Sequence, residues 1–284
     1  MNTSQPLSIA EPLTFDPSAF ASQALSSPAD LAAVLDHTLL KPEATRAQVI
    51  RLCHEAAEHR CACAMVNPAW VPVAVETLAG TGIPVGVVIG FPLGASLSAS
   101  KSDETKRLMK LGAHDIDMVL NIGFLKSGSK EDYEAIRQDI RGVVEVAHGG
   151  GGIVKVILET CLLNFEEKLR ASEIALAAGA DFIKTSTGKE GINATLPFSL
   201  VMVRMIREYH EATGYAVGYK PAGGIRSAKN ALEYLYLMKE ELGNRWLKPD
   251  LFRFGASALL TDIERQLEHF VTGRYSAAHR HPMV

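Results

Sequence analysis

Charged residues interrupt several apolar segments that would otherwise be typical of buried β-strands. A buried charge is costly unless it is paired, so such a cluster indicates either a structural ion-pair network or a reactive site. In the first alternative, Asp117 and Glu159 would only neutralise the lysines. Because the charges fall on four consecutive segments, we favour chemistry. The segments are HDIDMVL (114–120) with Asp115 and Asp117, GIVKVILE (152–159) with Lys155 and Glu159, DFIKT (181–185) with Lys184, and AVGYKP (216–221) with Lys220.

Carbonyl condensation is the chemistry that this cluster allows. A lysine must be neutral to attack a carbonyl group, whereas its usual pKa is about 10.4. Burial and a second cation nearby both lower that pKa, and Schiff-base lysines are activated in this way. Lys184 and Lys220 end adjacent predicted strands, so we expect one to be the nucleophile and the other the neighbouring cation. Asp117 is expected to move protons during imine formation and carbon–carbon cleavage.

Glycine-rich segments follow the last three predicted strands: TSTGKEG (185–191), PAGGIRS (221–227) and GASALL (255–260). Glycines let backbone amides approach an anion, and barrel enzymes commonly bind phosphate with the loops after strands seven and eight. Alternatively, the glycines only form tight turns and the cations are solvated. Three such loops directly after the lysine segments favour a phosphate site with Gly223, Gly224, Gly255, Ser257, Lys189 and Arg226.

Short apolar segments alternate with longer amphipathic ones along the chain, which predicts an α/β protein with parallel strands joined by helices. Eight units at about 30-residue spacing favour a single closed (β/α)8 TIM barrel over an open doubly wound sheet. The open sheet usually carries a glycine-rich dinucleotide loop after its first strand, whereas LLKPEAT follows here. The predicted strands are 34–38, 61–66, 83–90, 114–120, 152–159, 181–185, 216–221 and 251–255. The predicted helices are 45–58, 69–79, 98–110, 130–147, 165–178, 197–211, 227–242 and 257–270, and Gly80, Gly112, Gly179 and Gly214 are expected to follow helix ends in left-handed conformation.

The 284 residues fit one barrel domain at 28–271, between a flexible N-terminal extension (1–27) and a C-terminal tail (272–284). A net charge of −3 gives no broad basic surface, so nucleic acid is not an expected partner. The longest apolar run, 83–95, is too short and too interrupted by proline and glycine to span a membrane. The four cysteines match no zinc or redox spacing, which suits a reducing cytoplasm and predicts no metal site.

Several motifs, spread over residues 30–270, resemble those of the deoxyribose-phosphate aldolase family. FIKTSTGK together with KPAGGIR is the most specific pair. The motifs are DHTLLKP (36–42), DIDMVLNIG (115–123), KVILET (155–160), DFIKTSTGK (181–189), YKPAGGIR (219–226) and RFGAS (253–257).

The resemblance implies a class I aldolase without metal or organic cofactor, often a homo-oligomer. It would cleave 2-deoxy-D-ribose 5-phosphate reversibly to acetaldehyde and D-glyceraldehyde 3-phosphate in deoxynucleoside catabolism. Matched by motif, Lys184 is the Schiff-base lysine, Lys220 perturbs it, Asp117 moves protons and Lys155 supports Asp117. The phosphate would bind to Gly188, Lys189, Gly223, Gly224, Arg226, Gly255 and Ser257. Asp36 and Cys63 match positions that line the family's pocket, although a packing role is an equal alternative for both.

The chain departs from familiar bacterial members at two places. Ala258 stands where they carry a second hydroxyl residue after GAS, and the chain ends in HRHPMV with Tyr275 nearby rather than in a tyrosine. The variation after GAS, together with the segment GNRWLKPDLFRFGAS (243–257), resembles a longer, eukaryote-like branch. The alternatives are another phosphate-binding Schiff-base barrel (a transaldolase or a fructose-type aldolase), a non-catalytic barrel that binds sugar phosphates, and a pyridoxal-phosphate enzyme.

Overall fold

Eight parallel strands form the centre of the molecule in a computed structural model that describes Phe20 and residues 29–274. The extension 1–27, apart from Phe20, and the tail from Tyr275 onward lie outside the described residues. The strands are β1 (Leu35–Leu39), β2 (Cys63–Val66), β3 (Val85–Ile89), β4 (Ala113–Val119), β5 (Ile153–Ile157), β6 (Phe182–Lys184), β7 (Gly218–Lys220) and β8 (Phe254–Ala256).

Neighbouring strands pair in the order β7-β6-β5-β4-β3-β2-β1-β8. The ring is closed by two isolated backbone bridges, Tyr219 to Phe252 and Ala222 to Gly255, in place of a regular β7–β8 ladder. This near-closure of eight parallel strands confirms the (β/α)8 barrel and excludes the open sheet. The carboxyl ends of all eight strands therefore meet at one face.

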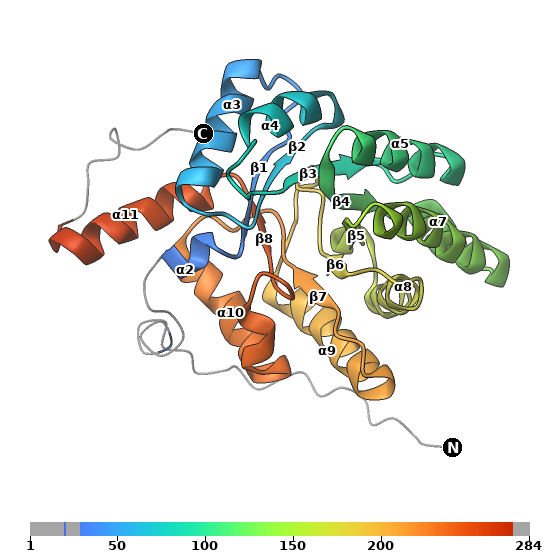
Figure 1. The fold of residues 1–284 in the computed structure, drawn as a ribbon. Coiled ribbons are helices and arrows are strands. Elements are labelled where there is room, and N and C mark those ends of the chain that lie inside the picture. The colour runs from blue at the N-terminus through green and yellow to red at the C-terminus, as the bar shows by residue number, and fades with distance from the viewer. Residues whose placement is uncertain (1–19, 21–28, 275–284) are drawn as a thin grey trace.

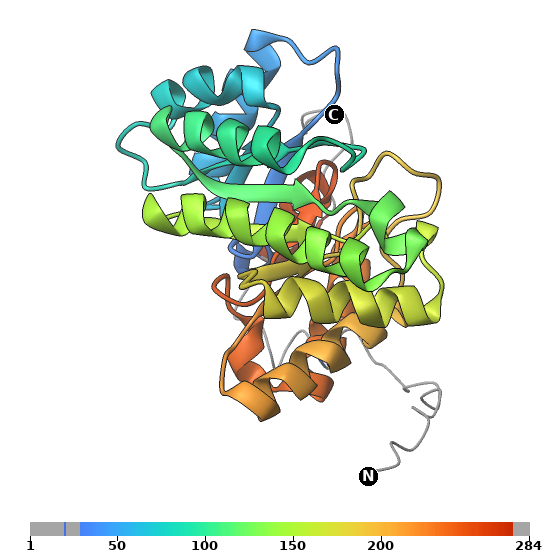
Figure 2. The same ribbon diagram turned by 90° about the vertical axis from the view of Figure 1, so that its right-hand side faces the viewer.

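Helices surround the strands, as Figure 1 shows. Turned by 90°, α5, α7 and α8 lie side by side along the outside of the barrel (Figure 2). Side-chain caps start several helices, including two capping boxes at Thr45 and Asn164. The helices are α2 (Ala29–Ala32), α3 (Arg46–Glu58), α4 (Val71–Thr77), α5 (Ser98–Lys110), α6 (Ile122–Ser127), α7 (Lys130–Gly149), α8 (Phe165–Ala177), α9 (Leu196–Thr213), α10 (Ala228–Leu242) and α11 (Leu259–Thr272), with short 3₁₀ helices at Pro68–Trp70, Thr160–Leu162 and Asn244–Leu247.

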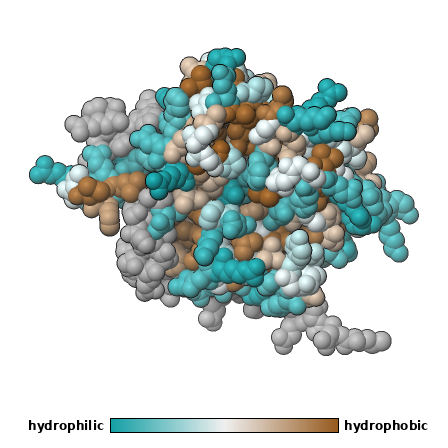
Figure 3. All heavy atoms as spheres, viewed as in Figure 1, coloured by the Kyte–Doolittle hydropathy of each residue, from teal (hydrophilic) through white to brown (hydrophobic). Residues whose placement is uncertain are grey.

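The large apolar core lies between the strands and the helices, because alternate residues of each strand point outward. Ile116 and Met118 of β4 belong to it, whereas Asp115 and Asp117 between them do not. Inside the barrel, Cys63 packs in a separate small apolar cluster with Met65 and Val88. The interior also contains buried charged side chains, among them Asp115, Asp117 and Lys155. On the face shown in Figure 3, hydrophilic residues dominate the periphery, with smaller groups of hydrophobic residues between them.

The predicted elements agree with the structure at most positions. The four glycines expected after helix ends all have left-handed φ values, between 75° and 100°. The sequence reading missed the short helix α6, and it placed the eighth strand at 251–255 instead of Phe254–Ala256. Within the described part of the chain, no helix combines the length and apolar character needed to span a bilayer.

Candidate active site

Two lysines and one aspartate meet at the carboxyl ends of β4, β6 and β7. Lys184 and Lys220 are paired residues of neighbouring strands, so their side chains leave the sheet side by side. Both ammonium groups donate to the same oxygen of Asp117, Oδ2, at 2.7 Å. All three side chains are buried, and Lys184 retains 3% exposure. The structure thus brings the three expected catalytic residues into direct contact.

The environment of Lys184 lowers its pKa to about 8. Burial is the largest cause, because it disfavours the charged ammonium form. Asp117 opposes this effect, while the positive charges of Lys220 and Lys155 lower the pKa further. An amine with this pKa is partly neutral near pH 7.5, as nucleophilic attack on a carbonyl requires.

A second layer of charges lies beneath this trio. Lys155 Nζ is 2.6 Å from Asp115 Oδ2, 3.3 Å from Asp117 Oδ1 and 3.5 Å from Asp36 Oδ2. Lys155 is therefore close to Asp117, as the resemblance implied. Burial would lower the pKa of Lys155, but these carboxylates raise it well above its usual value. Lys155 consequently remains a cation.

Asp36 and Cys63 lie deeper than expected. Neither residue lines the cavity described below, and both are fully buried. Asp36 Oδ2 accepts a hydrogen bond from Lys220 at 2.5 Å, so it is an ion-pair partner and not a packing residue. Burial and neighbouring carboxylates raise the pKa of the Cys63 thiol well above its usual value, so that thiol stays protonated.

Three of these residues hold potential ligand atoms within 4.8 Å of one another: Asp36, Cys63 and Asp115. The two carboxylates, however, already bind cationic side chains, Asp36 that of Lys220 and Asp115 that of Lys155. A dication at this position would have to displace those ammonium groups. We therefore assign the group to the ion-pair network.

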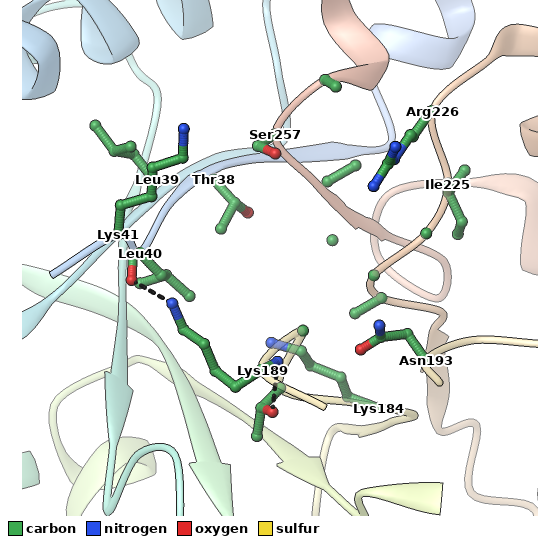
Figure 4. Close-up of a pocket in the computed structure, with 18 residues that line it drawn as sticks. Thr38, Leu39, Leu40, Lys41, Lys184, Lys189, Asn193, Ile225, Arg226 and Ser257 are labelled. Atoms are coloured by element: carbon green, nitrogen blue, oxygen red, sulfur yellow. Dashed lines mark hydrogen bonds between the residues drawn. The ribbon is translucent and has the colours of Figure 1, made fainter. Parts of the chain in front are cut away.

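A cavity of about 290 Å³ opens above Lys184. Figure 4 shows Lys184 and Lys189 on one side of it, and Ser257 and Arg226 on the opposite side. A further part of the wall comes from the end of β1 and the two residues after it: Thr38, Leu39, Leu40 and Lys41. The lining includes all seven residues expected to bind phosphate: Gly188, Lys189, Gly223, Gly224, Arg226, Gly255 and Ser257.

The glycines of this cavity have conformations or surroundings that require glycine. Gly188, Gly223 and Gly224 have φ values of 79°, 78° and 82°, a region that side chains disfavour. A Cβ on Gly255 would lie 3.0 Å from Lys220 Cε and 2.9 Å from Ala222 Cβ. Lys189 spans the cavity edge and donates to Leu40 O at 2.8 Å (Figure 4).

Ala258, which stands where familiar bacterial members of the family carry a second hydroxyl residue, also lines the cavity. It is the N-cap residue of α11, and its side chain makes no capping hydrogen bond. The position therefore offers no hydroxyl group either to a ligand or to the helix.

Two charged residues have roles that the sequence reading did not foresee. Glu159, grouped with the lysines, instead adopts a left-handed φ of 54° and accepts hydrogen bonds from the backbone and hydroxyl of Thr187. Arg253 was overlooked. Its Nη1 lies 2.7 Å from Asp36 Oδ1 and 3.1 Å from Asp115 Oδ2, inside the barrel. It interrupts the apolar segment LFRFG, so the criterion that selected the lysines would have found it.

The fold and the site define an α/β-barrel enzyme of the aldolase class, with an activated lysine at the carboxyl-end cavity. The chain belongs to the DeoC/LacD aldolase family, whose model matches residues 31–262. It is therefore an aldolase, a carbon–carbon lyase.

Relatives and solved structures agree with this family. The chain is 44% identical over 270 residues to the deoxyribose-phosphate aldolase of Homo sapiens, covering 88% of this chain and 83% of that protein. It is 45% identical over 214 residues to the deoxyribose-phosphate aldolase of Desulfitobacterium hafniense, covering 75% and 94%. The tetrameric deoxyribose phosphate aldolase from Aeropyrum pernix superimposes with a TM-score of 0.73 at 28% identity, covering 93% of this chain and all of that one (100%).

Proposed function

We propose that this aldolase cleaves 2-deoxy-D-ribose 5-phosphate reversibly to acetaldehyde and D-glyceraldehyde 3-phosphate through an imine on Lys184. The observation that carries the proposal is the position of Lys184: its amine lies at a cavity, has a pKa of about 8, and contacts a carboxylate. Relatives named for deoxyribose phosphate support the choice of substrate.

In the proposed reaction, neutral Lys184 attacks the C1 carbonyl of the open-chain sugar, and loss of water gives the iminium ion. Asp117 is the base within reach, 2.7 Å from the amine, and it removes the C3 hydroxyl proton or works through a bridging water. The C2–C3 bond then breaks, and its electron pair moves into the C1–C2 bond to form an enamine. Protonation at C2 and hydrolysis of the imine then release acetaldehyde.

Lys220 has an electrostatic role in this proposal. Its ammonium group shares Asp117 Oδ2 with Lys184 and disfavours a second positive charge there. Lys155 keeps Asp117 ionised from the other side: despite burial, the surrounding lysines hold the pKa of Asp117 well below its usual range. The phosphate group would bind across the cavity, between Lys189 and Arg226, where the glycine loops bring backbone amides close.

Borohydride trapping tests the proposal. The protein is incubated with acetaldehyde, reduced, digested and mapped by mass spectrometry. A two-carbon adduct on the peptide containing Lys184 is expected, and Lys184→Arg should abolish it together with cleavage of deoxyribose 5-phosphate. An adduct on Lys220 would reverse the two lysine roles. Efficient cleavage of a ketose phosphate, with none of deoxyribose 5-phosphate, would support a transaldolase or fructose-type activity instead.

We further propose that the protein forms homo-oligomers in the cytoplasm. The tetrameric relative supports the first part. Four free cysteines support the second, because thiols persist in a reducing compartment. Light scattering would give the mass in solution, and a monomer at micromolar concentration would contradict oligomer formation.

A further inference from the structure

The interior of the barrel holds an unequal number of opposite charges. Its ion pairs join four cationic side chains to three carboxylates. Buried charges are stable only when they are compensated, so the cluster favours a state in which one cation has lost its proton. The cations are Lys155, Lys184, Lys220 and Arg253, and the carboxylates are Asp36, Asp115 and Asp117.

Lys184 is the cation with the least compensation. Lys155 lies within 4 Å of all three carboxylates, whereas Lys184 contacts only Asp117 and shares that oxygen with Lys220. Lys220 has a second partner in Asp36, at 2.5 Å. When Lys184 is neutral, three cations balance three carboxylates. The state needed for attack on a carbonyl is then the electrically balanced state of the cluster.

Arg253 supplies the charge that creates this imbalance. It touches two of the three carboxylates, Asp36 and Asp115, and so satisfies them without a lysine. A guanidinium group does not lose its proton in proteins, so this charge is permanent. Its Nε donates to Pro249 O at 2.5 Å, and its guanidinium carbon lies 5.7 Å from the centre of the Phe182 ring. These contacts fix the guanidinium group inside the barrel.

We propose that Arg253 is a positioning residue for the aldol reaction: by binding Asp36 and Asp115, it makes Lys184 the unbalanced cation and so keeps that amine neutral. Arg253 does not touch the substrate cavity, and it acts through the carboxylates. The inference rests on the proposed function of Lys184 as the nucleophile. It predicts that the proton affinity of Lys184 follows the net charge of the cluster, whichever member is changed.

Several other titratable groups lie near Arg253 and Lys184. Arg253 faces Asp36, Asp115, Cys63, Lys155 and His114, and Lys184 faces Asp117, Lys155, Lys220 and Glu159. His114 pairs with Asp115 Oδ1 at 2.7 Å and is half exposed, so its charge changes with pH. Arg253→Met keeps this pairing, whereas Asp115→Asn, alone or combined with Arg253→Met, removes the carboxylate that raises the pKa of His114, so the titration of His114 differs in those two variants.

Competitive labelling with trace acetic anhydride measures the proton affinity of Lys184 without requiring catalysis. Labelling of the Lys184 peptide is followed against pH in the full-length protein. The wild-type midpoint is expected near the pKa of about 8. Arg253→Met removes one positive charge, and its midpoint should rise by about one unit, since a charge roughly 10 Å away at an effective dielectric constant of ~20 has that effect. Labelling at pH 7.5 would then fall about tenfold. Arg253→Lys should stay near wild type.

Asp115→Asn provides the opposite change and guards against a folding failure of Arg253→Met. It removes a negative charge, so the midpoint should fall by about one unit. The double variant Asp115→Asn, Arg253→Met restores the net charge and should return to within a few tenths of a unit of wild type. Equal midpoints in all folded variants, or a rise in Asp115→Asn, would overturn the inference. If these shifts occur but acetaldehyde forms no imine on Lys184, the proposed function fails and the charge relation stands.

Discussion

Gly224→Ala is the most direct test of the proposal that the cavity loop binds the phosphate group. Gly224 has a φ of 82°, and an added Cβ would meet no atom within 4 Å, so the substitution introduces backbone strain alone. A side chain at such a φ costs about 1–2 kcal/mol. The loop would relax to another conformation, and phosphate binding would have to restore the original one. This corresponds to a KM for deoxyribose 5-phosphate that is about 5–30-fold higher.

Gly214→Ala is the matched control. Gly214 ends α9, has a φ of 75° and also has open space around its Cβ, but it does not line the cavity. Gly214→Ala should lose about 1–2 kcal/mol of stability in urea unfolding and leave KM unchanged. Gly224→Ala, whose loop relaxes in the free protein, should lose less stability and show the higher KM. Gly223→Ala should be worse than either, because its Cβ would lie 2.6 Å from Asn193 Cγ.

Initial rates with deoxyribose 5-phosphate and with unphosphorylated deoxyribose separate anion binding from chemistry. We expect kcat/KM for deoxyribose itself to change less than about twofold in Gly224→Ala, because the strain affects only the loop that is proposed to bind phosphate. Equal losses with both substrates would show that the loop serves the reacting carbons. An unchanged KM for the phosphorylated sugar would refute its role in anion binding.

Three further predictions concern charge and backbone strain. Lys220→Met removes a cation that shares an oxygen with Lys184, roughly 5 Å away, so the pKa of Lys184 should rise by about two units. Imine formation at pH 7.5 should then slow about a hundredfold and recover as the pH rises, and an unshifted pH profile would contradict this. Lys101→Met leaves the buried carboxylate of Asp139 unpaired and should cost about 3–5 kcal/mol in urea unfolding, much of it regained with Asp139→Leu added. Arg60→Gly relieves a φ of 53° and should raise the free energy of unfolding by about 1 kcal/mol, which would appear as a higher midpoint in urea unfolding.

Much of the fold follows from local sequence patterns. The alternation of apolar strands and amphipathic helices, with glycines after the helix ends, predicted the barrel and most element positions. The closure between β7 and β8 could not be predicted in detail, since the two bridges depend on how the seventh and eighth strands approach each other. Helix α6 was missed because six residues, IGFLKS, are too few to show a helical period.

The candidate site was predictable wherever a charge interrupted an apolar strand. Lys184, Lys220 and Asp117 were found in this way, and their contact follows from the strand register. Partner choice within the cluster was not predictable, because alternation places a side chain inside the barrel without fixing which carboxylate it meets. The resemblance matched Asp36 to a pocket-lining position, with packing as the alternative, whereas in the structure Asp36 binds Lys220 below the cavity. Glu159 does not follow the strand alternation, because β5 ends at Ile157 and Glu159 itself has a left-handed φ.

The bridged junction between β7 and β8 has a consequence for the lifetime of the folded protein. Only two isolated bridges join the strands there, while loops that follow both strands line the cavity, at Gly223 and Ser257. An anion that contacts both loops would link the two strands. A ligand that binds only the closed ring stabilises it by mass action. Local opening at this junction, and cleavage by proteases that depend on such opening, should therefore be slower while the enzyme is turning over sugar phosphate than when it is empty.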